Sequence, residues 1–204
     1  MKTNTCIGCK TFPCVDVKHE CYAVADLDVK VEDITIIMIS EAAPPDPKDY
    51  YYAGEGALFE ETTMLAFQDA GAKVSSIGDI LNLGVYLTTA VKCGKTAYSI
   101  QTSTIDECSL ILEKELALFP HILVYLLMGD VAIKAANQIA RRAGEGRVIP
   151  AGSTYKIRGG DYYFHGRRAL PSYLQAGPSF FIEKVKRKMI AEDIAAALSL
   201  VNPV

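Results

Sequence analysis

Among the 204 residues of this chain, the cysteines most clearly combine type and spacing in a way that suggests chemistry. Cys6 and Cys9 form a C-x-x-C pair near the start, and 14 residues separate Cys93 from Cys108. Four thiolates from two distant segments can hold a four-iron four-sulfur (4Fe-4S) cluster or a zinc ion. These four cysteines are therefore candidate metal ligands.

Two further cysteines keep other arrangements open. Cys14 and Cys21 follow the C-x-x-C pair closely, so four neighbouring thiols, with His19, could instead form a zinc knuckle. For Cys93 and Cys108 the plain alternative is burial as small apolar side chains. The start of the chain lacks the apolar segment of a signal peptide, so we expect a cytoplasmic protein, in which thiols favour metal or redox chemistry over disulfides.

Two carboxylates follow the most apolar strand pattern in the chain. Residues 34–39 are all apolar or β-branched, and a run that does not alternate predicts a strand buried on both faces of a parallel sheet. The chain then enters a loop with three prolines that carries Glu41 and Asp46. Ligands of open parallel sheets bind beyond the carboxyl ends of the strands, so both acids are candidates for catalysis. The alternative is that they only solvate the turn.

The remaining pattern predicts strands alternating with helices, and therefore an α/β sandwich with a mainly parallel sheet. Residues 104–107 match a capping box at the start of a helix. Residues 1–33 look like a cysteine-rich cap on a single domain. We expect a hairpin formed by 155–157 and 162–165, buried strands at 34–40, 85–91 and 122–128, and helices at 58–70, 104–119, 131–143 and 179–200.

Charge is distributed unevenly along the chain. Residues 141–188 hold 11 Lys or Arg against three acids, a balance of +8, whereas the remainder has 10 basic and 21 acidic residues, a balance of −11. A basic final third on an acidic body predicts a face that binds a polyanion, although a solvated basic surface is the alternative. The longest apolar stretch is interrupted at Pro120, so no membrane helix is expected.

The order of these motifs resembles the iron–sulfur class of uracil-DNA glycosylases over nearly the whole chain. That class has C-x-x-C, then a strand leading into G-E-A-P-G, an aromatic and Gly-rich segment, T-N-V-V-K-C, a fourth cysteine and H-P-S-Y. The counterparts in this chain are C-I-G-C at 6–9, S-E-A-A-P at 40–44, the segment 51–56, T-T-A-V-K-C at 88–93, Cys108, and L-P-S-Y at 170–173.

This resemblance implies a three-layer α/β/α sandwich around a mainly parallel, four-stranded sheet. It also implies that a 4Fe-4S cluster, with zinc as the alternative, is held by Cys6, Cys9, Cys93 and Cys108. The expected role of the cluster is structural, joining the N-terminal cap to the sheet.

The implied activity is hydrolysis of the N-glycosidic bond of uracil or a related damaged base that has been flipped out of DNA. Glu41 is the first candidate for the carboxylate that stabilises positive charge on the sugar, and Asp46 is the second. Ala42 belongs to the same substrate-binding loop. Tyr51 or Tyr52 would stack on the flipped base.

Two positions depart from the family pattern. Thr89 stands where the family uses Asn to read the base, and Leu170 stands where it uses His to donate to the departing base. A hydroxyl offers less defined hydrogen bonding than an amide, and leucine donates nothing. We therefore expect weak or altered base specificity. A non-catalytic nucleic-acid-binding protein of the same fold, or a zinc or cluster protein of unrelated function, remains the alternative.

The partner implied by the resemblance is DNA, bound by a monomer. Basic side chains and one serine near the end of the chain are expected to contact phosphates. These candidates are Arg167, Arg168, Ser172, Lys184, Lys186 and Lys188.

Overall fold

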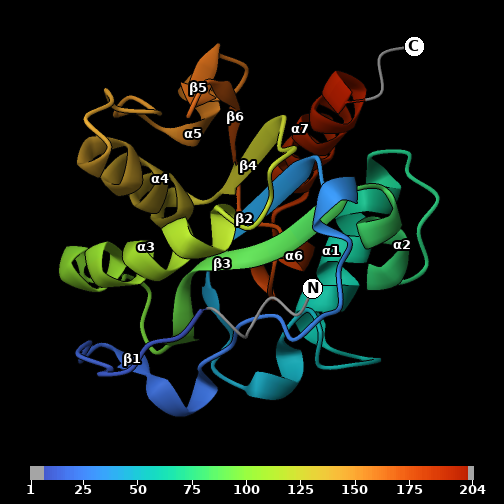
Figure 1. Ribbon diagram of the computed structural model, residues 1–204. Helices are drawn as coiled ribbons and strands as arrows, with labels where there is room; N and C mark the ends of the chain where they lie inside the picture. Colours follow the sequence, from blue (N-terminus) through green and yellow to red (C-terminus); the bar gives the residue numbers. More distant parts are fainter. Residues whose placement is uncertain (1–6, 202–204) are drawn as a thin grey trace.

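The computed structural model describes residues 7–201, so Cys6 lies outside the described part (Figure 1). The strands are β1 (Val17–Lys18), β2 (Ile36–Ala43), β3 (Val85–Lys95), β4 (Val124–Met128), β5 (Tyr162–Phe164) and β6 (Arg167–Ser172). The α-helices are α1 (Leu58–Asp69), α2 (Ile77–Asn82), α3 (Thr102–Leu116), α4 (Asp130–Arg142), α5 (Thr154–Ile157), α6 (Ser179–Ile182) and α7 (Lys184–Val201). Three short 3-10 turns are η2 (His19–Cys21), η3 (Val31–Asp33) and η4 (Pro47–Asp49).

The described strands form one sheet in the order β1-β3-β2-β4-β6-β5. Neighbours among β3, β2, β4 and β6 are parallel, whereas β1 and β5 pair antiparallel at the two edges. The expected mainly parallel sheet is thus confirmed, but its strand count was wrong, because six strands rather than four occur in residues 7–201. Both additional strands are short edge strands of two or three residues.

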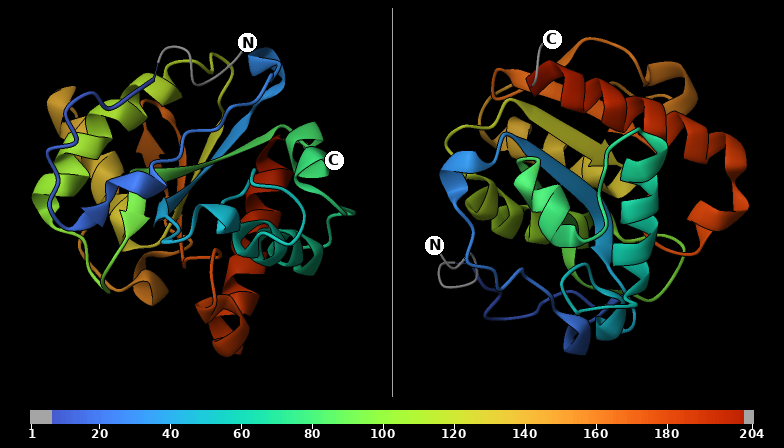
Figure 2. Two further views of the ribbon diagram at one scale, coloured as in Figure 1. Left: turned by 90° about the horizontal axis from the view of Figure 1, so that it is seen from below. Right: turned by 90° about the vertical axis from the view of Figure 1, so that its right-hand side faces the viewer.

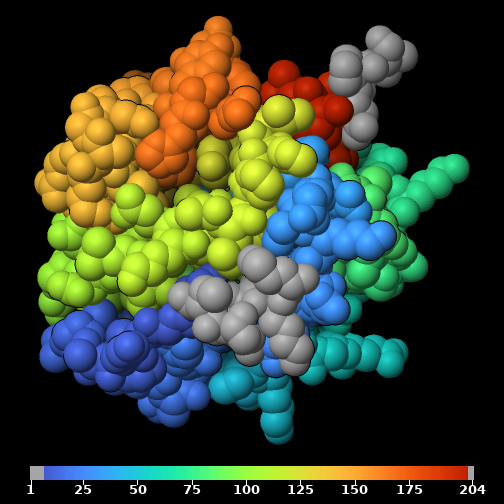
Figure 3. Space-filling view, viewed as in Figure 1, coloured from blue at the N-terminus to red at the C-terminus, as the bar shows by residue number. Residues whose placement is uncertain are grey.

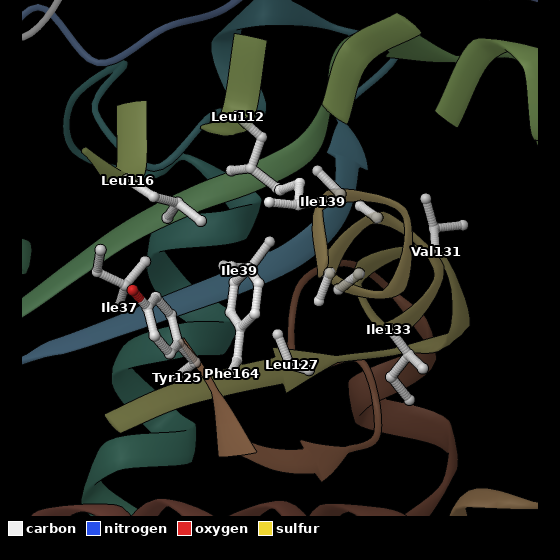
Figure 4. Close-up of a cluster of buried hydrophobic side chains, with 14 of the residues drawn as sticks. Ile37, Ile39, Leu112, Leu116, Tyr125, Leu127, Val131, Ile133, Ile139 and Phe164 are labelled. Atoms are coloured by element: carbon white, nitrogen blue, oxygen red, sulfur yellow. The ribbon is translucent and has the colours of Figure 1, made fainter. Parts of the chain in front are cut away.

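Side chains of β2 alternate between two apolar layers. Ile37 and Ile39 face a core shared with α3 and α4, whereas Ile36 and Met38 face a core shared with α1 and α7. The sheet therefore lies between two helical layers, which confirms the three-layer α/β/α sandwich (Figures 1 and 2). Figure 4 shows part of the first core, in which side chains of α3 point toward β2 and meet others from α4; the labelled residues include Ile37, Ile39, Leu112, Leu116 and Ile139.

Three expected elements differ in detail. The segment 155–157 is helical, and the hairpin instead joins β5 to β6 through His165 and Gly166, both at positive φ. The expected helix 179–200 is divided into α6 and α7 because Glu183 leaves helical backbone geometry, with φ −100° and ψ 72°. The helix expected from 104 begins at Thr102, and the hydroxyl of Thr104 donates to Asp16 rather than capping its own helix.

Residues 7–33 are mostly irregular and run along one edge of the sandwich. Strand β1 pairs with the end of β3, and the Asp16 carboxylate accepts hydrogen bonds from Thr104 and from the Gln101 N–H at 2.7 Å. Figure 3 shows this segment in blue, in contact with the lime-green surface of α3. The N-terminal segment is thus attached to β3 and to the start of α3. Within residues 7–201, every helix is too short or too polar to cross a membrane.

Candidate active site

A cleft of about 510 Å³ lies at the carboxyl edge of the parallel strands. It is lined by residues at or just after the ends of β2, β3, β4 and β6, which is where parallel sheets bind their ligands. Basic side chains from α4 and α7 contribute to its wall. The lining includes Glu41, Lys95, Tyr98, Gly129, Lys134, Tyr173, Phe180, Lys186 and Arg187.

Glu41 is the carboxylate that the fold presents to this cleft. It lies near the end of β2, its side chain is only 14% exposed, and it forms an ion pair with Lys95 at 2.7 Å. Gly129 makes room for it, because a Cβ at that position would lie 2.8 Å from the Glu41 Oε1 atom. Gly129 also has φ +94°, a conformation that side chains rarely adopt. The first candidate catalytic carboxylate is therefore oriented by a cation and a glycine.

Asp46 lies elsewhere and has a local role. It is exposed, and its Oδ1 accepts a hydrogen bond from the Lys48 N–H at 3.0 Å, which caps η4. It does not line the cleft. Ala42, next to Glu41, is buried. The sequence placed both acids in one loop, but the structure brings only Glu41 to the carboxyl edge.

The tyrosines expected to stack on a base, Tyr51 and Tyr52, do not line the cleft. Tyr51 is 1% exposed, and its ring packs on Phe59 with centroids 5.2 Å apart. Burial raises the pKa of the Tyr51 hydroxyl well above its usual value. The Tyr52 hydroxyl donates to the Leu87 carbonyl at 2.9 Å. Tyr98, which the sequence analysis did not select, is instead fully exposed at the cleft.

Thr89 and Leu170 are both buried on the side of the sheet covered by α1 and α7. Thr89 pairs with Ser40 across β3 and β2, and its hydroxyl has no hydrogen-bond partner. Leu170 is 7% exposed, pairs with Leu126 and belongs to the apolar core. At 170 this chain thus places an apolar side chain in an apolar environment.

Two polar residues that sequence reasoning did not assign to the site accompany Thr89. The Ser40 hydroxyl lies 2.5 Å from the Tyr51 hydroxyl and 3.1 Å from Oε1 of Gln175. Both Ser40 and Gln175 are completely buried. The only available signal was Ser40 in place of the family glycine; nothing in the sequence around Gln175 marked it.

Ser172 does not face solvent in this structure. It is fully buried and donates to the Asp193 carboxylate at 2.5 Å, which in turn accepts from Arg158 at 2.8 Å. Burial raises the pKa of Asp193, although Arg158 and Ser172 act in the opposite direction. The Ser172 hydroxyl, which was expected to donate to a phosphate, therefore donates instead in a hydrogen bond inside the protein that joins β6 to α7.

The expected basic residues occupy two separate places. Lys186 lines the cleft, and Lys184 and Lys188 are exposed nearby on α7. Arg187, which was not among the expected residues, also lines the cleft. Lys186 pairs with Glu183, and Arg187 pairs with Asp69. By contrast, Arg167 and Arg168 lie at the amino end of β6, the opposite edge of the sheet from the cleft. Of the basic residues expected to contact DNA, only those of α7 are therefore at or near the cleft.

The described candidate metal ligands lie near one another. Cys93 and Cys108 are buried, and burial raises their pKa values to about 12 and about 11. The charges of neighbouring thiolates, including Cys9 and Cys14, contribute to both shifts. Cys14, assigned by sequence only to the alternative zinc knuckle, thus belongs to the same neighbourhood. The Cys21 thiol instead donates to the Pro45 carbonyl at 3.2 Å.

These thiols do not by themselves form a metal centre. Within residues 7–201, no three His, Cys, Asp or Glu side chains are arranged as a metal-binding group. His19 Nδ1 lies 3.5 Å from the Cys93 sulfur. Cys6, the remaining expected ligand, lies outside the described residues.

A buried ion pair lies directly beside this cysteine neighbourhood. Lys92 is completely buried and donates to Glu115 at 2.5 Å, to the Thr88 hydroxyl at 2.7 Å and to the Thr89 carbonyl at 2.6 Å. Glu115 also accepts from the Tyr86 hydroxyl at 2.8 Å. The network joins α3 to β3 with its charged atoms fully hydrogen-bonded.

Comparison with known proteins identifies the family. A family model described as the uracil DNA glycosylase superfamily matches residues 32–192. The chain belongs to this superfamily. The matched segment contains Glu41 and every other residue that lines the cleft, and the superfamily assignment made from the sequence motifs is confirmed. The match begins after Cys6 and Cys9, so it has no bearing on those two cysteines.

One curated relative supports the same grouping. The chain is 29% identical over 124 residues to a protein named type-5 uracil-DNA glycosylase from the bacterium Thermus thermophilus. The similar region covers 60% of this chain and 54% of that protein. The chain thus matches about half the length of this relative.

Proposed function

We propose that this superfamily member hydrolyses the N-glycosidic bond of uracil or a related deaminated base in DNA. The observation that carries the proposal is Glu41, oriented by Lys95 in a cleft at the carboxyl edge of the sheet. Lys186 and Arg187 line the same cleft, and they are suited to hold the phosphates on either side of a flipped nucleotide.

The chemistry assigned to Glu41 is stabilisation of charge. As the bond between base and sugar breaks, its electron pair leaves with the base and positive charge develops on the sugar. A carboxylate beside the sugar stabilises that charge and orients the water molecule that adds to it. The water proton balances the negative charge of the departing base. Tyr98, fully exposed at the cleft, offers a ring on which a base or a neighbouring base can stack.

The test is base release from oligonucleotides that contain uracil, hypoxanthine or xanthine, detected as alkali-sensitive abasic sites. We expect release from at least one of them. Glu41→Gln should lower the rate at least about 100-fold, since loss of one charge-stabilising group commonly has that effect. Asp46→Asn is the matched control, because Asp46 caps η4 outside the cleft, and should stay within about twofold. No release from any substrate would contradict the proposal.

One observation favours a second candidate, DNA binding without hydrolysis. Leu170 donates no hydrogen bond and lies in the apolar core, so the departing base receives no proton from this position. If the protein binds these oligonucleotides in a salt-sensitive manner and releases no base, the non-catalytic function is the correct one.

We further propose that Cys6, Cys9, Cys93 and Cys108 hold a 4Fe-4S cluster, with zinc as the alternative. The support is the motif order and the neighbourhood of the three described thiols. Those three do not form a metal centre on their own, and the proposed role of the cluster is structural, joining the N-terminal segment to the sheet. Iron and zinc analysis of anaerobically purified protein distinguishes the two metals.

A further inference from the structure

Among the described residues, three lysines line the cleft, and each is paired with a carboxylate. Lys134 and Lys186 project from helices, and their side chains are 49% and 44% exposed. Lys95 is the last residue of β3, and its side chain is only 27% exposed. Its ammonium group also lies over the ring of Tyr98, 5.9 Å from the ring centroid. Lys95 is therefore the least exposed of the three and is still open to a ligand in the cleft.

The partner of Lys95 distinguishes it from the other two lysines. Its Nζ atom lies 2.7 Å from Oε2 of Glu41, the carboxylate to which the proposed hydrolysis assigns the sugar. The other two lysines pair with acids three or four residues away along the chain. An amine within hydrogen-bond reach of a carboxylate is the arrangement of a nucleophile and its base. A sugar in contact with Glu41 is therefore also within reach of the Lys95 side chain.

The product of the proposed hydrolysis is suited to react with such an amine. Release of the base leaves a deoxyribose with a hydroxyl at C1′, and this sugar opens to an aldehyde. Lysine amines condense with carbonyl groups to form imines. Release of the base also ends the need for a carboxylate to stabilise charge on the sugar, so Glu41 is then free to accept a proton from Lys95. The cleft thus brings an aldehyde, an amine and a base together once hydrolysis is complete.

On the basis of the proposed glycosylase function, we propose that Lys95 is the nucleophile of a second activity, cleavage of the DNA strand at the abasic site. Glu41 takes one proton from the ammonium group, and the nitrogen forms a bond to C1′. Glu41 returns that proton to the C1′ hydroxyl, which leaves as water and gives a positively charged imine.

Strand cleavage follows from the charge of this imine. The positively charged nitrogen withdraws electrons from C1′, so a proton can leave C2′ to Glu41 or to water. The electron pair of that C–H bond moves toward C3′, the C3′–O bond breaks, and the 3′ phosphate departs with the electrons of that bond. A second water molecule hydrolyses the imine and restores the Lys95 ammonium. The sequence consumes no oxidant or reductant.

The test starts from an abasic site, so it does not depend on base release. Oligonucleotides whose uracil has been removed beforehand by another glycosylase are incubated with saturating protein and borohydride, which reduces the imine to a permanent amine bond. We expect a covalent protein–DNA adduct on denaturing gels and a cut strand when borohydride is omitted. Peptide mass mapping of the adduct should place the sugar on Lys95.

Two variants of Lys95 and one control complete the design. Lys95→Arg keeps the positive charge beside Glu41, but a guanidinium group stays protonated and cannot form the imine, so the adduct should fall to background. Lys95→Met should show the same loss, and it remains informative if the arginine does not fit. Lys134→Met removes another lysine that lines the cleft and pairs with a carboxylate, and it should form as much adduct as wild type.

The outcomes separate this inference from the proposed function. A wild-type protein that forms no adduct, an adduct that persists in both Lys95 variants, or mass mapping to another residue would overturn the role of Lys95. If base release is observed in any of these cases, the glycosylase function stands. An adduct on Lys95 in a protein that releases no base would support the second activity alone. A wild-type protein that neither forms the adduct nor releases a base would remove both.

Discussion

Lys92 offers the sharpest test of how the sheet and α3 are held together. Its ammonium group and the Glu115 carboxylate are 2.5 Å apart, and neither side chain is exposed. Replacing one partner of a buried pair leaves the other charge uncompensated, which typically lowers the free energy of unfolding by about 3–5 kcal/mol. Lys92→Met should therefore lower Tm by roughly 6–20 °C, because about 2–4 °C corresponds to 1 kcal/mol in a chain of this size.

Two companion variants make the result interpretable. Lys92→Met combined with Glu115→Leu removes both charges and should recover most of the loss, since apolar replacements of whole buried pairs are commonly tolerated. Lys134→Met breaks an equally short pair with Asp130 at 2.5 Å, but both side chains are about half exposed or more, so it should change stability by less than about 1 kcal/mol. Thermal and urea unfolding measure all three. A loss below about 1 kcal/mol in Lys92→Met, or a double variant no more stable than the single one, would refute this reasoning.

Asp16 anchors the N-terminal segment to α3, and the Gln101 and Thr104 hydrogen bonds lower its pKa although burial opposes them. A lowered carboxyl pKa gives stability that is present above about pH 4 and is lost as the pH falls through the folded-state value, so Asp16→Asn should destabilise the protein at pH 7 but hardly at pH 2, as acid unfolding curves will show. If the cluster proposal is right, Cys93→Ala should lose about four iron atoms per chain and melt earlier than wild type; full iron retention would contradict it. Reversing three lysines of α7 to Glu should abolish DNA binding in low salt, and unchanged affinity would exclude α7 as the contact surface. These three are Lys184, Lys186 and Lys188.

The parallel centre of the sheet could be predicted because its signal is local. Residues 34–39 and 122–128 are apolar without alternation, which is the pattern of strands covered on both faces, and the structure places them between two helical layers. Strand β1 could not be predicted, because two residues carry no periodicity and become a strand only by pairing with β3. Strand β5 was expected at 162–165, but its partner is β6 and not the segment 155–157. Both the formation of β1 and the pairing of β5 depend on tertiary contacts.

The candidate site was only partly predictable for a related reason. Glu41 was selected because it follows the strand, and the structure places it in the cleft. Asp46 met the same criterion, but three prolines in the loop direct the chain into η4, where its carboxylate caps a backbone N–H. Arg167 and Arg168 illustrate a different limit: net charge along the sequence does not reveal which edge of the sheet a strand end occupies.

The surroundings of Thr89 show where motif comparison stops. At position 89 the comparison indicated only that the amide used by the family to recognise the base is absent, because motifs are compared one position at a time. In the folded chain the loss of an amide at Thr89 is accompanied by polar side chains at Ser40 and Gln175, 135 residues apart, which meet on the same side of the sheet. A ring of hydrogen bonds drawn from three separate segments has no spacing that a sequence could display. The unpartnered Thr89 hydroxyl therefore has a polar neighbour in Ser40, which is hydrogen-bonded to Gln175, and comparison of position 89 alone does not reveal these groups.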